Sequence, residues 1–278
     1  MCKVSAVIIT FNEEYNLSRL LPRLNWCEEI VVVDSGSTDA TLQLCKKYDC
    51  RIYYRKFDGY GSQKRYALSL ARYHWILFLD ADELLSNELV QEIQQELRHP
   101  SALGYYIPMS FMFMGKEFRF GKESGRYFLR LFDKRAGDFS DDKVHERVIV
   151  DGTCKKLRGR IYHYSYRNFS QYFEKFNRYS SYGAEMYFEK GKRKTVLSTI
   201  FAIPLNFLKY YLLERNFFNG LAGFYWSVLC SFYHFAKYIK LREMYAQADE
   251  SKSIFVPGNL FSMKTLGAGK SLHSDKAD

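Results

Sequence analysis

Apolar and polar positions follow two rhythms in the first hundred residues. Short apolar runs alternate with longer segments in which apolar residues recur at the three- and four-residue spacing of a helix. The apolar runs lie at residues 4–9, 30–33, 51–54 and 75–79, and the helical segments at 12–24, 38–48, 62–73 and 86–97. Strands that are apolar along their whole length, alternating with helices, predict an α/β fold. We expect a mostly parallel, Rossmann-like sheet with helices on both faces.

The pattern changes after residue 100. Further short apolar runs are separated by turns that contain Gly, Asp and Lys, and they lie at residues 105–107, 127–132, 148–150 and 160–164. This pattern of short apolar runs and turns predicts mixed or antiparallel strands that are added to the parallel half of the sheet. The two halves of the sheet domain are therefore predicted at residues 1–100 and 101–165.

Beyond residue 165 the pattern is helical, and we expect one region of helices over 166–245. Residues 216–236 contain no Asp, Glu, Lys or Arg, and at ~1.5 Å per residue such a helix could cross a bilayer core of ~30 Å. Asn, Ser, His and Gly residues dilute this segment, so we favour helices that dip into one leaflet over a true span. Residues 246–278 are rich in Ser, Gly and Lys and are predicted to form a disordered tail.

The positive charge of the chain is concentrated in one segment. The sequence has 41 Lys and Arg against 31 Asp and Glu, a net charge of +10, and 18% of its residues are aromatic. Residues 1–100 hold 12 basic and 14 acidic side chains, whereas residues 151–215 hold 13 and 5. Basic residues beside an aromatic, apolar stretch are typical of a segment that binds an anionic membrane surface. A solvated helix face is the simpler alternative.

The cysteines and the first residues bear on the compartment. None of the 6 Cys pairs as C-x-x-C, which argues against zinc-ribbon and thioredoxin-type sites and favours a reducing compartment. The apolar run at residues 4–9 is short and is followed at once by polar residues, as in a buried strand and unlike a secretory signal. We therefore expect the bulk of the chain in the cytoplasm.

Polar clusters follow three of the predicted parallel strands, at the edge where ligands of such sheets bind. The sharpest cluster is Asp80-Ala81-Asp82. Two carboxylates one residue apart can face the same cleft, and Mg²⁺ and Mn²⁺ prefer carboxylate oxygens. Helix capping is the alternative role for such acids, but Ser86 or Asn87 can cap the helix that follows. Asp80 and Asp82 are therefore predicted to hold a divalent cation against a nucleotide diphosphate.

The other two clusters are candidates for binding the nucleotide. Asp34 ends the second strand, where its carboxylate can accept hydrogen bonds from a base or a ribose; a turn aspartate is the alternative. Four residues after the first strand are expected close to the same nucleotide: Thr10, Phe11, Asn12 and Glu13. Two basic residues near the start of the third helix can meet phosphate, although a solvated helix start is the simpler interpretation: Lys64 and Arg65.

The order and spacing of these elements resemble the GT-A, family 2 glycosyltransferases. The matching segments are residues 7–14, 30–39 and 78–83, which read VIITFNEE, IVVVDSGSTD and FLDADE. The chain is most similar to the bacterial branch that includes the lipopolysaccharide inner-core β-1,4-glucosyltransferases. The elements shared with that branch lie at residues 144–146, 161–164, 219–224 and 238–241. The branch often has Asp-Gly where this chain has Asn219-Gly220, so no catalytic role is assigned there.

The resemblance implies a GT-A fold whose half at 1–100 binds a nucleotide sugar and whose half at 101–165 binds the acceptor. It also implies an inverting transfer. An acceptor hydroxyl attacks the anomeric carbon, the nucleoside diphosphate leaves, and a carboxylate takes the proton. Glu146 is the expected base and Asp142 the alternative, with His145 orienting the base or the acceptor. His163 is expected as a further metal ligand or a diphosphate contact, unless it is structural.

We therefore expect a metal-dependent hexosyltransferase that uses Mn²⁺ or Mg²⁺, a UDP-sugar and a lipid-linked glycan acceptor. Its product would be lipopolysaccharide or another cell-surface glycan, and it would lie on the cytoplasmic face of the bacterial inner membrane as a peripheral protein. A protein or peptide acceptor is the alternative for the same chemistry. A nucleic-acid-binding protein is disfavoured, because the acidic strand ends repel phosphate unless a metal intervenes.

Overall fold

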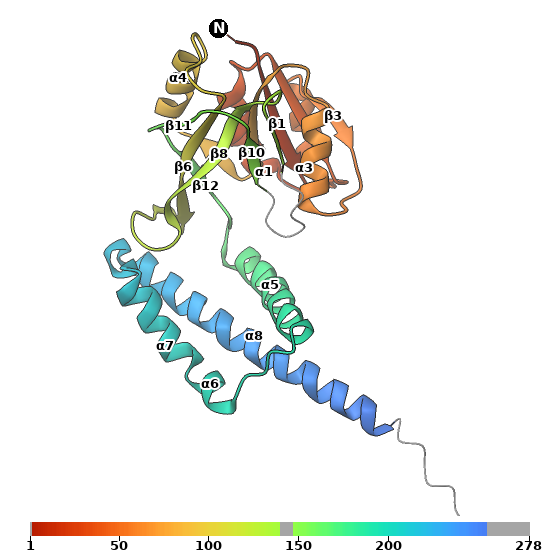
Figure 1. Cartoon of the computed structure of the whole chain (residues 1–278), viewed down its shortest axis with the longest axis vertical. Helices are drawn as coiled ribbons and strands as arrows, with labels where there is room; N and C mark the ends of the chain where they lie inside the picture. Colours follow the sequence, from red (N-terminus) through yellow and green to blue (C-terminus); the bar gives the residue numbers. More distant parts are fainter. Residues whose placement is uncertain (1, 140–146, 255–278) are drawn as a thin grey trace, which may run out of the picture.

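The computed structural model describes residues 2–139 and 147–254, which form a sheet domain and a region of helices (Figure 1). The parallel part of the sheet has the strand order β3-β2-β1-β4. Its elements are β1 (Val4–Thr10), α1 (Glu14–Leu20), η1 (Leu21–Leu24), β2 (Glu29–Asp34), α2 (Thr41–Lys47), β3 (Arg51–Tyr54), α3 (Tyr60–Ser69), β4 (Trp75–Asp80) and α4 (Asn87–Glu96). The alternation of strands and helices predicted for residues 1–100 is confirmed.

Side chains of the parallel strands divide between two cores, one on each face of the sheet. In β1, Ala6 and Ile8 join a core with α1, α2 and α4, whereas Val7 joins a core with α3. The residues of β2 and β4 divide in the same way. Successive side chains of a strand point to opposite faces, so a strand covered on both faces must be apolar throughout. This explains the continuous apolar runs, and the α/β class is confirmed.

The second half of the domain extends the same sheet with mixed strands, as predicted. β8 pairs antiparallel with both β4 and β6, and the order continues as β4-β8-β6-β12-β5. The bounds are β5 (Glu83–Leu85), β6 (Gly104–Phe113), β7 (Lys116–Glu117), β8 (Ser124–Asp133), β9 (Gly137–Phe139), β10 (Val148–Val150), β11 (Cys154–Lys156) and β12 (Ile161–His163). The short β5 was not expected. Its antiparallel pairing with β12 puts Glu83 opposite His163.

In the helical region, α5 and α7 lie on either side of the long α8 (Figure 1). The bounds are α5 (Phe169–Glu189), α6 (Val196–Ile200), α7 (Ala202–Leu208), the π-helical η2 (Lys209–Leu213), η3 (Asn216–Asn219) and α8 (Leu221–Ile254). The helix α8 extends to residue 254, past the predicted start of the tail at 246, through a segment that begins with the good helix formers Ala246, Gln247 and Ala248. Within the described ranges, no helix combines the length and apolarity needed to cross a membrane.

A buried amide joins the helices to the sheet domain. The Oδ1 of Asn219 accepts hydrogen bonds from the backbone N–H groups of Arg119 at 3.0 Å and Phe120 at 3.3 Å. Its Nδ2 donates to the Phe120 carbonyl at 2.9 Å. Gly121 of the sheet domain permits this close approach, since a Cβ there would lie 2.4 Å from the Oδ1 of Asn216. The Asn219-Gly220 element therefore has a structural role in connecting the two regions.

Candidate active site

Three strand ends meet at one edge of the sheet. The register places Thr10 of β1 beside Asp34 of β2, and Ile9 beside Asp80 of β4. Parallel strands present their carboxyl ends to the same side, so the polar residues that follow them converge. The three clusters recognised in the sequence are thus brought together around one edge.

The loops after β1 and β2 are tied to each other. Asn12 has a left-handed backbone, with φ of 55°, and its Oδ1 accepts a hydrogen bond from the Thr38 N–H at 2.8 Å. Asp34 is buried, and its carboxylate accepts hydrogen bonds from the N–H groups of Gly36 and Ser37 and from the Ser37 hydroxyl. Asp34 therefore holds the turn that follows it, which is the alternative considered above. Its contact with a base or a ribose stays a prediction.

The residues after β1 differ in their exposure. Thr10 Oγ1 is buried and has no hydrogen-bond partner in the part of the chain that the structure describes, and the Phe11 side chain is 56% exposed. The Glu13 carboxylate accepts hydrogen bonds from Asn16 at 2.7 Å and from Arg167 at 2.9 Å. Arg167 lies just before α5, so the start of the helical region contacts the first strand end.

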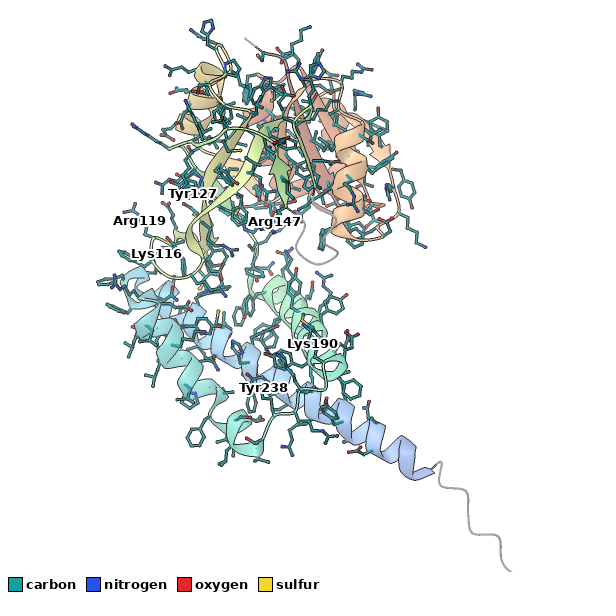
Figure 2. The ribbon with its side chains drawn as sticks, in the orientation of Figure 1. Lys116, Arg119, Tyr127, Arg147, Lys190 and Tyr238 are labelled. Carbon is teal, nitrogen blue, oxygen red and sulfur yellow. The ribbon has the colours of Figure 1, made fainter. Side chains whose placement is uncertain are left out.

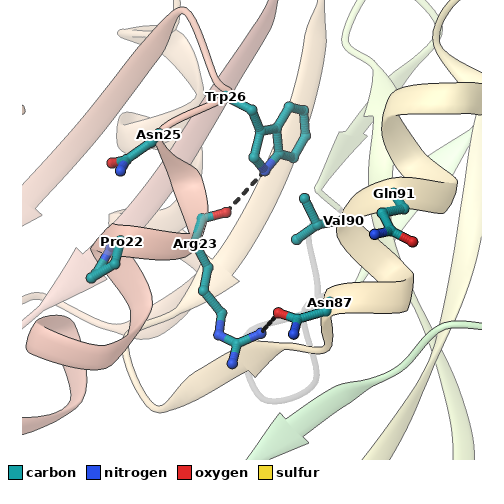
Figure 3. Close-up of a pocket in the computed structure, with 7 residues that line it drawn as sticks. All are labelled: Pro22, Arg23, Asn25, Trp26, Asn87, Val90 and Gln91. Carbon is teal, nitrogen blue, oxygen red and sulfur yellow. Dashed lines mark hydrogen bonds between the residues drawn. The ribbon is translucent and has the colours of Figure 1, made fainter.

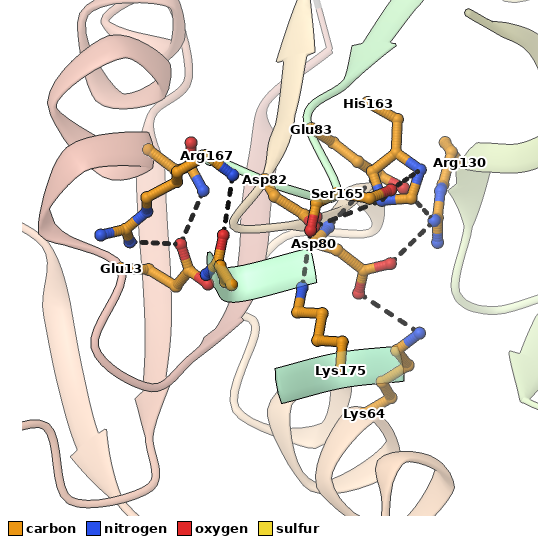
Figure 4. Close-up of polar contacts among 12 residues, drawn as sticks. Glu13, Lys64, Asp80, Asp82, Glu83, Arg130, His163, Ser165, Arg167 and Lys175 are labelled. Carbon is orange, nitrogen blue, oxygen red and sulfur yellow. Dashed lines mark hydrogen bonds and ion pairs between the residues drawn. The ribbon is translucent and has the colours of Figure 1, made fainter. Parts of the chain in front are cut away.

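Asp80 lies between two cations (Figure 4). Its Oδ1 is 3.3 Å from the Lys64 ammonium on α3, and its Oδ2 is 3.0 Å from the Arg130 guanidinium on β8. Burial alone would raise the pKa of Asp80, but the charges of Lys64 and Arg130 outweigh it and hold this pKa below its usual range. Arg130 also pairs with Glu83. For Glu83 burial prevails over Arg130 and raises the pKa to about 7.

Asp82 pairs with His163, whose Nε2 is 3.3 Å from the Asp82 Oδ2 (Figure 4). The Ser165 hydroxyl lies 3.3 Å or less from both ring nitrogens. Burial would lower the pKa of His163, but the Asp82 carboxylate raises it to about 9. In this arrangement the imidazole is therefore protonated at neutral pH, and the carboxylate carries its counter-charge.

The predicted metal ligands are neighbours, but they are not arranged around a common point. Across residues 2–139 and 147–254, no group of three or more His, Cys, Asp or Glu side chains is placed to hold a metal ion. Lys64 and Arg130 face the oxygens of Asp80, and the protonated His163 faces Asp82. The two carboxylates are nevertheless the donor type that Mg²⁺ and Mn²⁺ prefer. The donor set fits such an ion if the positive side chains of Lys64, Arg130 and His163 move away from the two carboxylates.

The remaining predicted residues are Arg65 and three residues of the segment 142–146. Arg65 follows Lys64 on α3, where successive side chains point about 100° apart, and it is half-buried. The expected base Glu146, its alternative Asp142 and the neighbouring His145 lie outside the described residues. Ser86 caps α4 by accepting a hydrogen bond from the Leu89 N–H at 3.1 Å, so that helix does not need Asp80 or Asp82.

A hollow of about 340 Å³ between η1 and α4 contains none of the predicted site residues (Figure 3). Trp26 and Val90 line it, and across it the Arg23 guanidinium donates a hydrogen bond to the Asn87 side chain. Its position apart from the strand ends gives it no part in the site.

Sequence reasoning missed Arg130, Glu83 and Arg167 as site residues. Arg130 had a usable signal, because it is the charged residue within the apolar run at 127–132. A charge in a covered strand requires buried partners, and here these are Asp80 and Glu83. Arg167 had no such signal, since its contact with Glu13 depends on where the chain leaves the sheet domain.

The comparison with protein families decides the assignment. Residues 5–156 match the family described as Glycosyl transferase family 2. The chain belongs to this family. The predicted resemblance and the GT-A fold are therefore confirmed, and the protein is a glycosyltransferase. The matched residues include all three strand-end clusters.

Relatives extend the likeness beyond the sheet domain. A protein of Rhizobium meliloti described as "Lipopolysaccharide core biosynthesis glycosyltransferase LpsC" is 32% identical over 252 residues, which cover 87% of this chain and 93% of that protein. An uncharacterized glycosyltransferase of Rickettsia typhi is 31% identical over 263 residues, 88% of each chain. The crystal structure of Staphylococcus aureus TarS 1–349 in complex with UDP-GlcNAc has a TM-score of 0.44 and 19% identity, covering 88% of this chain and 92% of that chain. The sequence relatives carry the assignment, and their coverage includes part of the helical region.

Proposed function

We propose that this glycosyltransferase moves a hexose, such as glucose, from a UDP-sugar to a lipid-linked glycan acceptor, with inversion at the anomeric carbon. The observation that carries the proposal is the convergence of the ends of β1, β2 and β4 around acids paired with Lys64, Arg130 and His163. The printed role of the Rhizobium meliloti relative in lipopolysaccharide core biosynthesis supports a lipopolysaccharide or a related cell-surface glycan as the product.

The donor would lie across the ends of β1 and β2. Thr10 at the end of β1 and the exposed Phe11 that follows it lie at this edge and are the candidate contacts for the nucleotide. Asn12 and Glu13 fix the loops, and Asp34 retains lone pairs for a base or a ribose beyond the turn that it holds. Lys64 and Arg65 on α3 are the proposed phosphate contacts.

In the proposed transfer, the acceptor oxygen bonds to the anomeric carbon while the bond from that carbon to the diphosphate breaks. The hydroxyl proton passes to the carboxylate of Glu146, or to Asp142 as the alternative, and His145 orients that carboxylate or the acceptor. Asp80, Asp82 and His163 would hold a Mn²⁺ or Mg²⁺ ion. When bound, this ion would neutralise negative charge on the departing diphosphate.

The helices carry an unusual exposed surface, which we name the apolar face and define as the exposed apolar side chains between Val196 and Leu221. Each of its six most exposed members has more than half of its side chain in solvent: Ile200, Leu213, Leu197, Leu221, Leu205 and Phe218. An aliphatic surface of this extent marks an interaction site on a soluble protein. Burial in the acyl region of a membrane would remove it from water.

Charge around the apolar face supports a lipid partner. No Asp or Glu occurs from residue 190 to residue 213, and exposed basic residues precede the face at Lys190, Lys192 and Arg193. Lys116 and Arg119 of the sheet domain lie near the start of α8, well separated from Lys190 (Figure 2). Basic residues at both ends of an aliphatic surface fit an anionic bilayer. We therefore place the protein as a peripheral enzyme on the cytoplasmic face of the inner membrane.

A thermal-shift panel of nucleotide sugars with and without Mn²⁺ tests the donor. A ligand that binds the native state raises the unfolding midpoint as its occupancy rises. We expect UDP-glucose or another UDP-hexose to raise the midpoint with Mn²⁺, and CDP- and GDP-sugars to have no effect. A panel in which no UDP-sugar changes the midpoint would refute the donor assignment.

The alternative acceptor, a protein or a peptide, is separated by the product. Membranes and cytosolic protein are each incubated with the enzyme and a radiolabelled UDP-sugar. We expect the label in the fraction extracted by organic solvent. Label that stays with protease-sensitive material instead would favour a protein acceptor.

A further inference from the structure

An apolar groove of about 680 Å³ runs between the sheet domain and α8. Phe113 and Met114, at the end of β6, form one wall. Val228 and Leu229 of α8 form the facing wall. The volume is in the range of ~300–1,000 Å³ found for small-molecule sites, and such sites are mostly apolar with few polar groups.

One end of the groove reaches the candidate active site. Arg167 lines the groove, and the same guanidinium donates hydrogen bonds to the Asn12 carbonyl and to the Glu13 carboxylate, both at 2.9 Å. Asn12 and Glu13 follow β1 directly. A molecule that fills the groove would therefore have its polar end beside the strand end to which we assign the donor.

The groove is also continuous with the apolar face. Tyr225 and Val228 line the groove, and Leu221, one turn before Tyr225, belongs to the apolar face. These three residues are spaced by four and three positions, which puts them on one side of α8. Their exposed fractions are 64%, 40% and 39% in chain order, so the stripe becomes less exposed toward the groove. A chain lying on the apolar face can follow this stripe inward without crossing charged residues.

We propose that this groove binds the hydrocarbon chain of the lipid-linked acceptor and brings its saccharide to the strand ends. Arg167, which pairs with Glu13, and the neighbouring Asn168 supply polar groups at this end that can bind the polar head of an amphiphile, while Phe113, Met114, Val228 and Leu229 make the opposite part of the wall apolar. A free saccharide or a polar peptide has no apolar part of matching size to cover this wall. The choice of a saccharide-bearing lipid rests on the proposed function, whereas hydrocarbon binding by the groove does not.

Photolabelling tests the groove directly. The full chain is irradiated with hexadecyl phosphate that carries a diazirine near the middle of the chain, and labelled residues are mapped by mass spectrometry. We expect labelling at Met114, Val228 and Leu229, competed by hexadecyl phosphate and not by methyl phosphate. Leu229→Trp fills the groove and should lower this labelling at least about fivefold. Ile149→Trp, at a 56% exposed position of the sheet domain that does not line the groove, should leave it unchanged.

Labelling confined to residues 196–218, or equal labelling of the two Trp variants, would overturn the proposal. Val228→Trp serves in place of Leu229→Trp if that variant does not fold, because Val228 is 39% exposed and tolerates a larger side chain more easily. UDP binding is measured on the same samples by thermal shift. If the groove is labelled but UDP does not bind, the proposed donor is refuted and hydrocarbon binding by the groove stands. If UDP binds but the groove is not labelled, only the groove proposal is refuted.

Discussion

The sheet domain and the helical region distribute their side chains in opposite ways. In the sheet domain, aliphatic residues fill the interior, and charged residues such as Glu83 and Arg130 are buried in pairs. Where the helices meet the sheet domain, Phe, Tyr and Trp rings form most of the buried cluster, and many apolar residues of the helices, such as Leu197 and Leu213, face outward. A charge is costly to bury without a partner, and an exposed leucine is costly where only water surrounds it.

This difference assigns different tasks to the two regions. Buried, paired charges at the strand ends provide the fixed electrostatic groups that transfer of a charged leaving group needs. The exposed apolar side chains of the helices provide no such electrostatic groups, but they can be buried in the acyl region of a membrane. The comparison is sharpened by substitutions whose effects should be confined to one region.

The largest effect is expected for Asp82→Ala in the sheet domain. Loss of this carboxylate removes a proposed metal ligand and the counter-charge of His163, so turnover of the UDP-sugar should fall about 10³-fold or more. Release of UDP measures it, and Asp151→Ala, at an exposed turn of the same domain, is the matched control. Full activity of Asp82→Ala would show that the metal assignment is wrong.

Arg130→Met should destabilise the sheet domain more than any surface change. It leaves the buried Glu83 without its cation and removes one of the two cations of the half-buried Asp80, which costs about 3 kcal/mol. Urea denaturation measures the free energy of unfolding. Arg126→Met changes the same residue type on the same strand, at a side chain that is 54% exposed, and should cost under about 0.5 kcal/mol. Equal losses in the two variants would mean that the buried pairs do not contribute.

The sequence was sufficient for much of this domain because its signals are local. Continuous apolar runs follow from strands covered on both faces, and each predicted parallel strand is present within two residues of its expected ends. The convergence of Thr10, Asp34 and Asp80 followed from parallel direction alone. The ion pairs did not, because the partners of Asp80 come from α3 and β8, and their approach depends on the packing of the whole sheet.

The helical region was predicted less completely for a related reason. Helical spacing shows that a segment is a helix but not which side finds a partner. The sequence therefore indicated an apolar, basic region without identifying Leu205 and Leu213 as exposed. The same limit applied to Arg167, whose contact with Glu13 lies at one end of the groove.

Leu205→Asp should weaken membrane binding while leaving the fold unchanged. Its side chain is 62% exposed, so the substitution costs little in water, but inserting a charge in place of leucine should cost about 2 kcal/mol at the bilayer. That corresponds to an about 30-fold lower partition into vesicles of phosphatidylethanolamine and phosphatidylglycerol, measured by flotation. Ile149→Asp is the matched control in the sheet domain, because Ile149 is 56% exposed there. Equal losses in both variants would contradict a membrane contact specific to the helices.

The smallest effect is expected where the two regions meet. Asn219→Asp keeps an oxygen that can accept from the N–H groups of Arg119 and Phe120, but it loses the Nδ2 donor. The carboxylate oxygen that replaces Nδ2 would lie against the carbonyl oxygen of Phe120 and the Oδ1 of Asn216. Nδ2 donates two hydrogen bonds, and the loss of each costs about 1 kcal/mol, so the thermal midpoint should fall by about 4–8 °C for a chain of this size.

Asn219→Ala should lower the midpoint further than Asn219→Asp, because it also leaves the buried N–H groups of Arg119 and Phe120 without an acceptor. If this amide joins two regions with separate tasks, both variants should retain UDP binding and vesicle binding. Proteolysis between the regions, around residues 164–168, should become faster in both. Loss of UDP binding without faster cleavage would instead place Asn219 within the machinery of the active site, where no role is assigned to it.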